Sequence, residues 1–178
     1  TPGISSAASD VYKRQNIAIA TISDSRTLAN DRSGDILENR IKEDNHNCFS
    51  RSIIKDDMKK IENFFKACLE NNLIDIIITT GGTGLTGRDS TPEVLNKIIE
   101  KDIPGFGEMF RQISFNKIGT SALQSRAMAG ISKGKFFFSL PGSPSACIDA
   151  WDNILKFQLN INHKPCNLIE LIPRLLEK

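Results

Sequence analysis

Short runs of β-branched and apolar residues alternate along this chain with stretches in which apolar residues recur every three or four positions. A short continuous apolar run is typical of a buried strand, and the three-to-four spacing is typical of a helix with one buried face. The pattern predicts four strands, each followed by at least one helix. The strands are expected at residues 16–23, 48–54, 73–79 and 135–140.

Residues that favour helix starts mark where the five expected helices begin. Ser33 is expected to cap the first helix, and Asp56 or Asp57 to cap the second. Thr91 is expected at the N-cap of the third helix, with Pro92 as its first helical residue. After an interruption at 104–107, the last two helices are expected at 108–115 and 145–159.

Continuous apolar strands joined by helix-length connections predict an α/β fold. Helices then cover both faces of a mostly parallel sheet and form three layers, αβα. In such folds ligands bind outside the carboxyl ends of the strands, where the strand order reverses. Three loops rich in Gly, Ser, Thr or Asp follow expected strand ends, at residues 24–32, 79–91 and 141–144. We expect these loops to meet at one binding site.

The chain length of 178 residues fits one domain. We expect this domain at residues 16–170, followed by a C-terminal tail at 171–178. Residues 1–15 are small and polar, then basic, and have no helical or strand period. Because part of this stretch also resembles translated adapter sequence, we expect a non-native or disordered N-terminal segment.

Composition excludes several classes of protein. The net charge of +2 is too small to indicate a nucleic acid or an acidic membrane surface as partner. No apolar run approaches the roughly 20 residues that span a bilayer. The four cysteines lie far apart and there are only two histidines, so the spacing of a zinc site is missing. We expect buried or partly buried reduced thiols in a cytoplasmic protein.

The loop after the third strand has the layout of an anion-binding loop, with four glycines within residues 81–87. Glycine lets the backbone approach a ligand closely and adopt positive φ, so that N–H groups point at phosphate oxygens. The same loop carries a carboxylate, Asp89, where a loop that only binds anions would have none. This acid indicates additional chemistry.

Two common phosphate-binding signatures do not account for this loop. A P-loop needs Lys and then Ser or Thr after its last glycine, whereas Gly87 is followed by Arg88 and Asp89. Residues 82–87 match the letters of the dinucleotide fingerprint. They follow a later strand, however, and lack the acid expected at a strand end about 20 residues further on. Dinucleotide binding is therefore the weaker interpretation.

A longer, ordered set of segments resembles the molybdopterin-binding family of molybdenum cofactor synthesis, the MoaB and MogA proteins. The resemblance covers essentially residues 16–170, and several motifs in one order are far more specific than one glycine loop. Residues 119–126 and 164–167 resemble the MoaB branch more than the MogA branch. The main matching segments are Ser23-Asp24, Asp31-Arg32-Ser33-Gly34, Thr79-Thr80-Gly81-Gly82-Thr83-Gly84, Arg88-Asp89, Thr91-Pro92-Glu93, Ile103-Pro104-Gly105-Phe106-Gly107-Glu108, Ser121-Ala122-Leu123-Gln124-Ser125-Arg126 and Leu140-Pro141-Gly142-Ser143-Pro144.

The resemblance implies that the chain binds molybdopterin, a pterin dithiolene with a terminal phosphate, and adenylylates it with ATP and Mg²⁺. Asp56 and Asp89 are then the catalytic acids and the magnesium ligands, because hard cations prefer carboxylate oxygen. The resemblance also implies a homotrimer or homohexamer. The residues expected to contact the substrates are Ser23, Asp24, Ser25, Gly81, Gly82, Thr83, Gly84, Ser143 and Pro144.

Two other functions remain open. The chain could be a non-catalytic molybdopterin carrier or regulator on the same fold. It could also be a nucleotide hydrolase of the competence-damage type, whose domain shares the glycine loop. The unbroken segments at 103–108 and 119–126 argue against the hydrolase.

Structural roles also remain open for individual residues. Asp56 could simply cap a helix, and Asp89 could cap the next helix or pair with Arg88. Arg26 and Arg32 are candidates for phosphate contact through their forked donors. The pair at 125–126 matches the family, but the residues themselves do not indicate its role.

Overall fold

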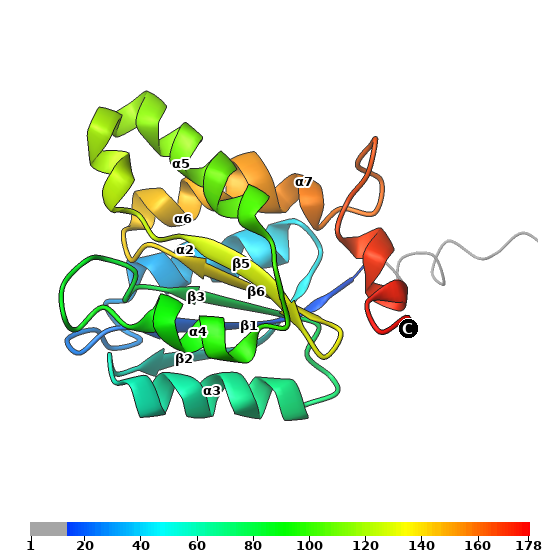
Figure 1. Cartoon of the computed structure of the whole chain (residues 1–178), viewed down its shortest axis with the longest axis horizontal. Helices are drawn as coiled ribbons and strands as arrows, with labels where there is room; N and C mark the ends of the chain where they lie inside the picture. Colours follow the sequence, from blue (N-terminus) through cyan, green and yellow to red (C-terminus); the bar gives the residue numbers. More distant parts are fainter. Residues whose placement is uncertain (1–13) are drawn as a thin grey trace, which may run out of the picture.

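The computed structural model describes residues 14–178, and its centre is a six-stranded sheet in the order β2-β1-β3-β6-β5-β4 (Figure 1). The strands are β1 (Asn16–Ile22), β2 (Asn47–Ile54), β3 (Ile76–Thr80), β4 (Lys101–Asp102), β5 (Met128–Ser132) and β6 (Lys135–Leu140). The α-helices are α2 (Arg32–Glu43), α3 (Met58–Glu70), α4 (Thr91–Ile98), α5 (Pro104–Ile118), α6 (Pro144–Ala150) and α7 (Lys156–Gln158). The remaining helical segments are the 3₁₀ turns η1 (Gly119–Gln124) and η3 (Ile169–Arg174) and the π-helical turn η2 (Trp151–Leu155).

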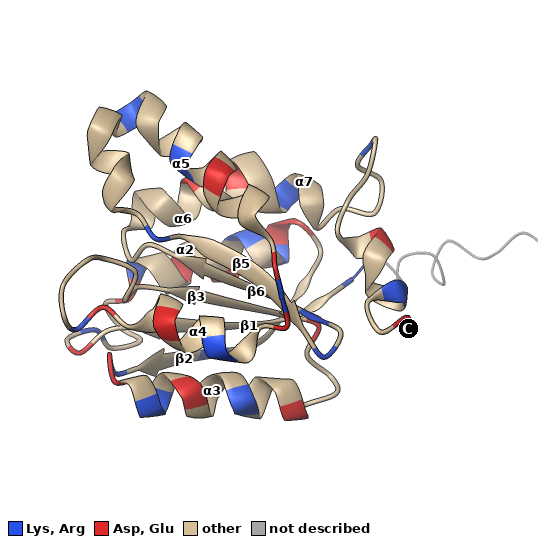
Figure 2. Cartoon of the chain, viewed as in Figure 1, with Lys and Arg blue, Asp and Glu red and all other residues tan. Residues whose placement is uncertain are grey.

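Helices cover both faces of the sheet, which confirms the expected three-layer α/β fold (Figure 1). α2, α5 and α6 pack on one face, and α3 and α4 pack on the other, each through its own cluster of buried apolar side chains. The phenylalanines at 136–138 alternate between the two clusters and are at most 1% exposed, so this strand contributes core side chains to both layers. Charged residues lie mainly in the helices and loops, and the central strands β1 and β3 have none (Figure 2).

β2, β1, β3 and β6 are parallel, and β5 and β4 add an antiparallel edge that the apolar pattern does not predict. β5 contains Ala129 and Gly130, which have low strand propensity. At Gly130 a Cβ would lie 2.6 Å from the side chain of Ile99, so close packing selects glycine there. Lys133 and Gly134, with φ of 47° and 76°, form the tight turn into β6.

The starts of α2 and α3 depend on aspartates. Asp31 caps α2, so the prediction that Ser33 is the cap is wrong. The Ser33 hydroxyl instead donates to the carbonyl of Gly142 at 2.9 Å, which joins α2 to the loop after β6. Asp57 caps α3 by accepting a hydrogen bond from a backbone N–H. Asp56, the other candidate for this cap, is therefore available for a different role.

The starts of α4 and α5 also differ from the expectation. Ser90 is at the N-cap of α4, and the Thr91 hydroxyl donates to the carbonyl of Gly81 at 3.1 Å instead of capping the helix. Residues 104–107 are the first turn of α5 and not an interruption, and α5 continues to Ile118. A Cβ at Gly107 would lie 2.6 Å from the carbonyl oxygen of Ala127, so this glycine permits close packing and does not break the helix.

The expected helix at 145–159 forms as α6, η2 and α7, with a π-helical turn in its middle. In that turn Trp151 is fully buried, and its indole N–H donates to the Asp44 carboxylate at 2.6 Å. Beyond it, η3 follows, and Ile172 and Leu175 pack against the core. The segment expected as a C-terminal tail thus contributes apolar contacts.

Several remaining sequence predictions concern the ends and the cysteines. Residues 1–13 of the expected N-terminal segment lie outside the described residues, whereas the Gln15 N–H donates to the ring of His46. All four cysteines are free thiols; three are buried or partly buried, but Cys166 is exposed, contrary to expectation. Among the elements formed by residues 14–178, no helix combines the length and apolarity needed to cross a bilayer.

Candidate functional site

The strand ends predicted to form a site meet at one edge of the sheet. β1 and β3 are neighbours, and the chain passes from β1 to β2 on one side and from β3 to β4, at the far edge beyond β6 and β5, on the other. This is the point where an open α/β sheet leaves a crevice for a ligand. A cavity of about 1420 Å³ lies there. All the predicted site residues line it: Ser23, Asp24, Ser25, Asp56, Gly81, Gly82, Thr83, Gly84, Asp89, Ser143 and Pro144.

Close backbone packing at Gly81 holds the ends of β1, β3 and β6 together. Its N–H donates to the carbonyl of Leu140 at 2.9 Å, which joins the ends of β3 and β6. A Cβ on Gly81 would lie 2.3 Å from the carbonyl oxygen of Ile22 at the end of β1. Its φ of 104° lies in the region that glycine adopts most readily. The glycine is therefore required for the strand ends to approach one another.

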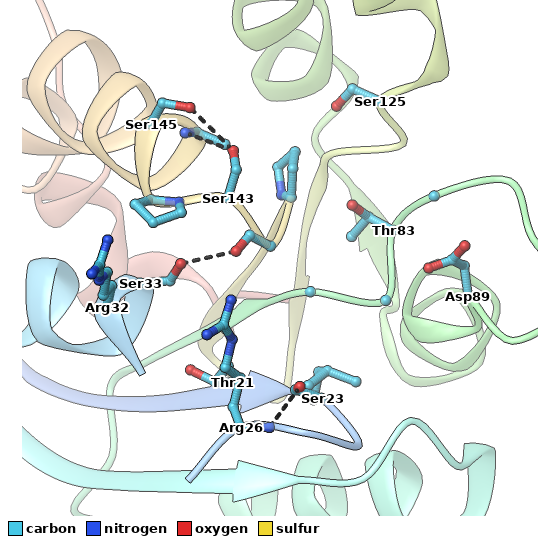
Figure 3. A pocket seen from close by; sticks show the side chains of 18 of the residues that line it. Thr21, Ser23, Arg26, Arg32, Ser33, Thr83, Asp89, Ser125, Ser143 and Ser145 are labelled. Atoms are coloured by element: carbon cyan, nitrogen blue, oxygen red, sulfur yellow. Dashed lines mark hydrogen bonds between the residues drawn. The ribbon is translucent and has the colours of Figure 1, made fainter. Parts of the chain in front are cut away.

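The glycine loop has unpaired backbone donors in residues that line the cavity. Among the described residues, the N–H groups of Gly82 and Thr83 have no hydrogen-bond partner. Opposite them, Ser143 caps α6 by accepting from the N–H of Ala146 at 3.2 Å (Figure 3). Free N–H groups and hydroxyls around one concave surface can bind phosphate oxygens without a formal positive charge.

Three carboxylates lie at the glycine-loop end of the cavity. Asp89 accepts from the backbone N–H of Thr86 at 2.9 Å and from its hydroxyl at 2.6 Å. The hydrogen bond from the Thr86 hydroxyl is the main reason that the pKa of Asp89 is lowered, so this carboxyl is ionised at neutral pH. Asp24 forms an ion pair with Arg88. Asp89 thus neither caps α4 nor pairs with Arg88, and both structural alternatives for it are excluded.

The pKa of Asp56 is raised, whereas that of Asp89 is lowered. Burial raises the pKa of Asp56 first, and the negative charges of Asp89 and Asp24 raise it further, while a hydrogen bond from Ser90 acts against them. A Cβ on Gly82 would lie 3.4 Å from a carboxylate oxygen of Asp56, so this acid lies against the glycine loop. Mutual repulsion of carboxylates is relieved when a cation binds between them.

These acids fit a magnesium ion that also has phosphate ligands. No group of three or more His, Cys, Asp or Glu side chains within residues 14–178 is arranged to hold a metal by itself. Mg²⁺ in phosphate-transfer sites typically takes one or two carboxylates and completes its shell with waters and substrate phosphates. Asp56 and Asp89 meet that requirement, since both line the cavity beside the glycine loop.

Two features of the site were not derivable from the residue pattern. Arg126 donates from Nε to the carbonyl of Gly84 at 2.8 Å and from Nη2 to the carbonyl of Asp89 at 2.9 Å. At another part of the cavity lining, Lys117 pairs with the buried Asp149. The family motif at 125–126 was a signal for the first contact, whereas nothing in the sequence pointed to the second. Arg26 and Arg32 also line the cavity.

A family match and curated relatives connect the chain with molybdenum cofactor biosynthesis. The chain matches the family described as a probable molybdopterin binding domain over residues 18–160. It is 40% identical over 151 residues to molybdenum cofactor biosynthesis protein B of Escherichia coli (strain K12), covering 85% of this chain and 89% of that protein. It is 43% identical over 135 residues to the protein of the same name from Bacillus cereus, and this match covers 75% of this chain and 80% of that protein.

A solved structure gives the same result. The crystal structure of a molybdenum cofactor biosynthesis protein B superimposes on this chain with a TM-score of 0.80 at 40% identity. The superposition covers 82% of this chain and 91% of the other. The similarity therefore extends over the sheet and both helical layers, and not only over the glycine loop.

Proposed function

This chain belongs to the molybdopterin-binding family that includes molybdenum cofactor biosynthesis protein B, and from that premise we propose that it adenylylates molybdopterin with ATP and Mg²⁺. One observation carries the proposal: unpaired N–H groups of a glycine loop and two carboxylates lie together in one cavity. The cavity volume of about 1420 Å³ exceeds the roughly 300–1,000 Å³ typical of a site for one small ligand, which supports binding of two substrates.

In the proposed reaction, an oxygen of the molybdopterin phosphate attacks the α-phosphorus of ATP. The bond from that phosphorus to the bridging oxygen of the β-phosphate breaks, pyrophosphate leaves, and a phosphoanhydride forms. The N–H groups of Gly82 and Thr83 hold the phosphate of molybdopterin. Asp56 and Asp89 would hold the Mg²⁺, which when bound would neutralise phosphate charge. The protein then contributes mainly by positioning the two substrates.

The test is release of pyrophosphate by the purified protein with molybdopterin, ATP and Mg²⁺. Asp89→Asn and Asp56→Asn should each retain molybdopterin binding and lose turnover, because they remove a negative charge without changing the side-chain size. Asp57→Asn is the matched control: this residue is adjacent in sequence but caps α3, and asparagine is also a good cap. Normal turnover by Asp89→Asn would refute the assigned role.

Pyrophosphate release, together with an assay of ADP-ribose hydrolysis, separates the adenylyltransferase from the two other functions. Tight molybdopterin binding without pyrophosphate release identifies a non-catalytic carrier or regulator on the same fold. Hydrolysis of ADP-ribose identifies a nucleotide hydrolase of the competence-damage type. Both would replace the adenylyltransferase proposal.

Assembly into a homotrimer or homohexamer remains a prediction. α5 and η1 expose four large apolar side chains, Met109, Phe115, Ile118 and Leu123, at 50–72%. Phe115, Ile118 and Leu123 follow one another along the end of α5 and η1, and a large exposed apolar surface is typical of a region that another protein covers. We expect a second copy of this chain to cover them, and light scattering of wild-type protein and of Phe115→Glu tests this. A monomeric wild type would contradict it.

A further inference from the structure

Arg126 connects the glycine loop to the body of the protein at two separate points. Arg126 lies two residues before the start of β5 at Met128. Its guanidinium donates to the carbonyls of Gly84 and Asp89. A third contact, with the carboxylate of Glu93 in α4, directs the guanidinium toward the loop. The three acceptors surround one planar group, an arrangement that a guanidinium satisfies and an ammonium does not.

The two carbonyls bracket the turn that carries the Asp89 carboxylate. Between them the chain folds on itself: the Asp89 N–H donates to the carbonyl of Thr86 at 3.1 Å, and Thr86 donates back to the Asp89 carboxylate. These bonds shape the turn but do not connect it to the sheet. Within residues 14–178, the turn also has the ion pair of Arg88 with Asp24, in which the Arg88 side chain is 73% exposed. Exposed ion pairs contribute little to stability, so this pair holds the turn only weakly.

Fixing a carbonyl also fixes the N–H of the next residue, because the two groups point in opposite directions in a trans peptide plane. The hydrogen bonds from Arg126 therefore direct the N–H groups of Leu85 and Ser90 away from the guanidinium. Both ends of the turn are oriented in this way. The position of the Asp89 carboxylate relative to the glycine loop depends on both.

We propose that Arg126 is a positioning residue for Asp89, holding the turn at residues 85–89 in the geometry that nucleotide transfer requires. The catalytic part of this statement rests on the adenylyltransferase function proposed above. Arg126 does not line the cavity, although its neighbour Ser125 does. It acts through the backbone carbonyls on either side of the turn.

The experiment compares Arg126→Ala and Arg126→Lys with Arg40→Ala. Arg40 is a matched control because its side chain is 26% exposed, against 28% for Arg126, and it also pairs with a carboxylate, that of Asp152. We expect Arg126→Ala to lower kcat by about 100-fold, the cost of a small misplacement of reacting groups. Molybdopterin binding should change less than threefold. The kcat of Arg126→Lys should stay close to that of Arg126→Ala. Added methylguanidine should raise the kcat of Arg126→Ala but leave that of Arg40→Ala unchanged.

A second measurement does not need turnover. Hydrogen–deuterium exchange of the amides at residues 84–90 should be faster in Arg126→Ala than in wild type, and unchanged in Arg40→Ala. If wild-type protein turns over, a kcat of Arg126→Ala within threefold of wild type overturns the proposal. If wild-type protein releases no pyrophosphate, the adenylyltransferase function fails by itself. The positioning role is then decided by exchange, and equal exchange in the two proteins overturns it.

Discussion

Replacing Gly81 by alanine should destabilise the whole site, because this residue lies where the ends of β1, β3 and β6 meet. Its φ is 104°, and an added Cβ would lie 2.3 Å from the carbonyl oxygen of Ile22. That oxygen belongs to the backbone of a central strand, so it cannot move aside as a flexible side chain could. On the other side, Gly142 approaches the Cα of Gly81 so closely that its own Cβ would lie 3.2 Å away.

Two costs add in the Gly81→Ala variant. A non-glycine residue at positive φ costs about 1–2 kcal/mol. Forcing an additional methyl group into a packed site costs about 1–3 kcal/mol. The expected loss of unfolding free energy is therefore about 2–5 kcal/mol. For a chain of this size each kcal/mol lowers the Tm by about 2–4 °C, which gives a decrease of roughly 10 °C.

The assay is thermal and urea unfolding of the variant beside Gly87→Ala. Gly87 is in the same loop, but an added Cβ would meet nothing within 4 Å and its φ is not positive. The control should stay within about 0.5 kcal/mol of wild type. Molybdopterin binding should weaken in Gly81→Ala only. If both variants unfold at the wild-type midpoint, the argument from close approach of the strand ends is refuted.

Two further predictions concern charged groups. The pKa of Asp56 is raised by burial and then by Asp89 and Asp24, so stability is lost as pH rises through that pKa and the carboxyl ionises. Asp56→Asn should therefore raise the Tm at pH 7 but not near pH 3, where the carboxyl is already neutral; a lower Tm at pH 7 would contradict this. Arg51→Met leaves Asp31, at 1% exposure, without its ion-pair partner and should cost about 3 kcal/mol in urea unfolding. A loss of unfolding free energy below about 1 kcal/mol would show that the fold does not depend on the ion pair of Arg51 with Asp31.

Much of the fold follows from local pattern. β1, β3 and β6 are central strands buried on both faces, and such strands are continuous apolar runs in any sequence. The edge strand β5 escapes this criterion because Gly130 in its middle is selected by close packing against Ile99, which lies outside the strand in sequence. The helix starts at Ser33 and Thr91 were wrong for a similar reason, since their hydroxyls serve loops that only the tertiary structure brings near.

The sequence by itself determined the family, the three-layer class and the loop residues that line the glycine-loop side of the cavity. It could do so because ordered motifs and apolar periodicity are properties of the chain read in one dimension. Only the tertiary structure decided what each acid does. Asp57 and not Asp56 caps α3, Asp89 is held by its own turn, and Arg126 fixes that turn from another part of the chain. Hydrogen bonds and electrostatic repulsion depend on distances in space, and these arise only when the strand ends converge.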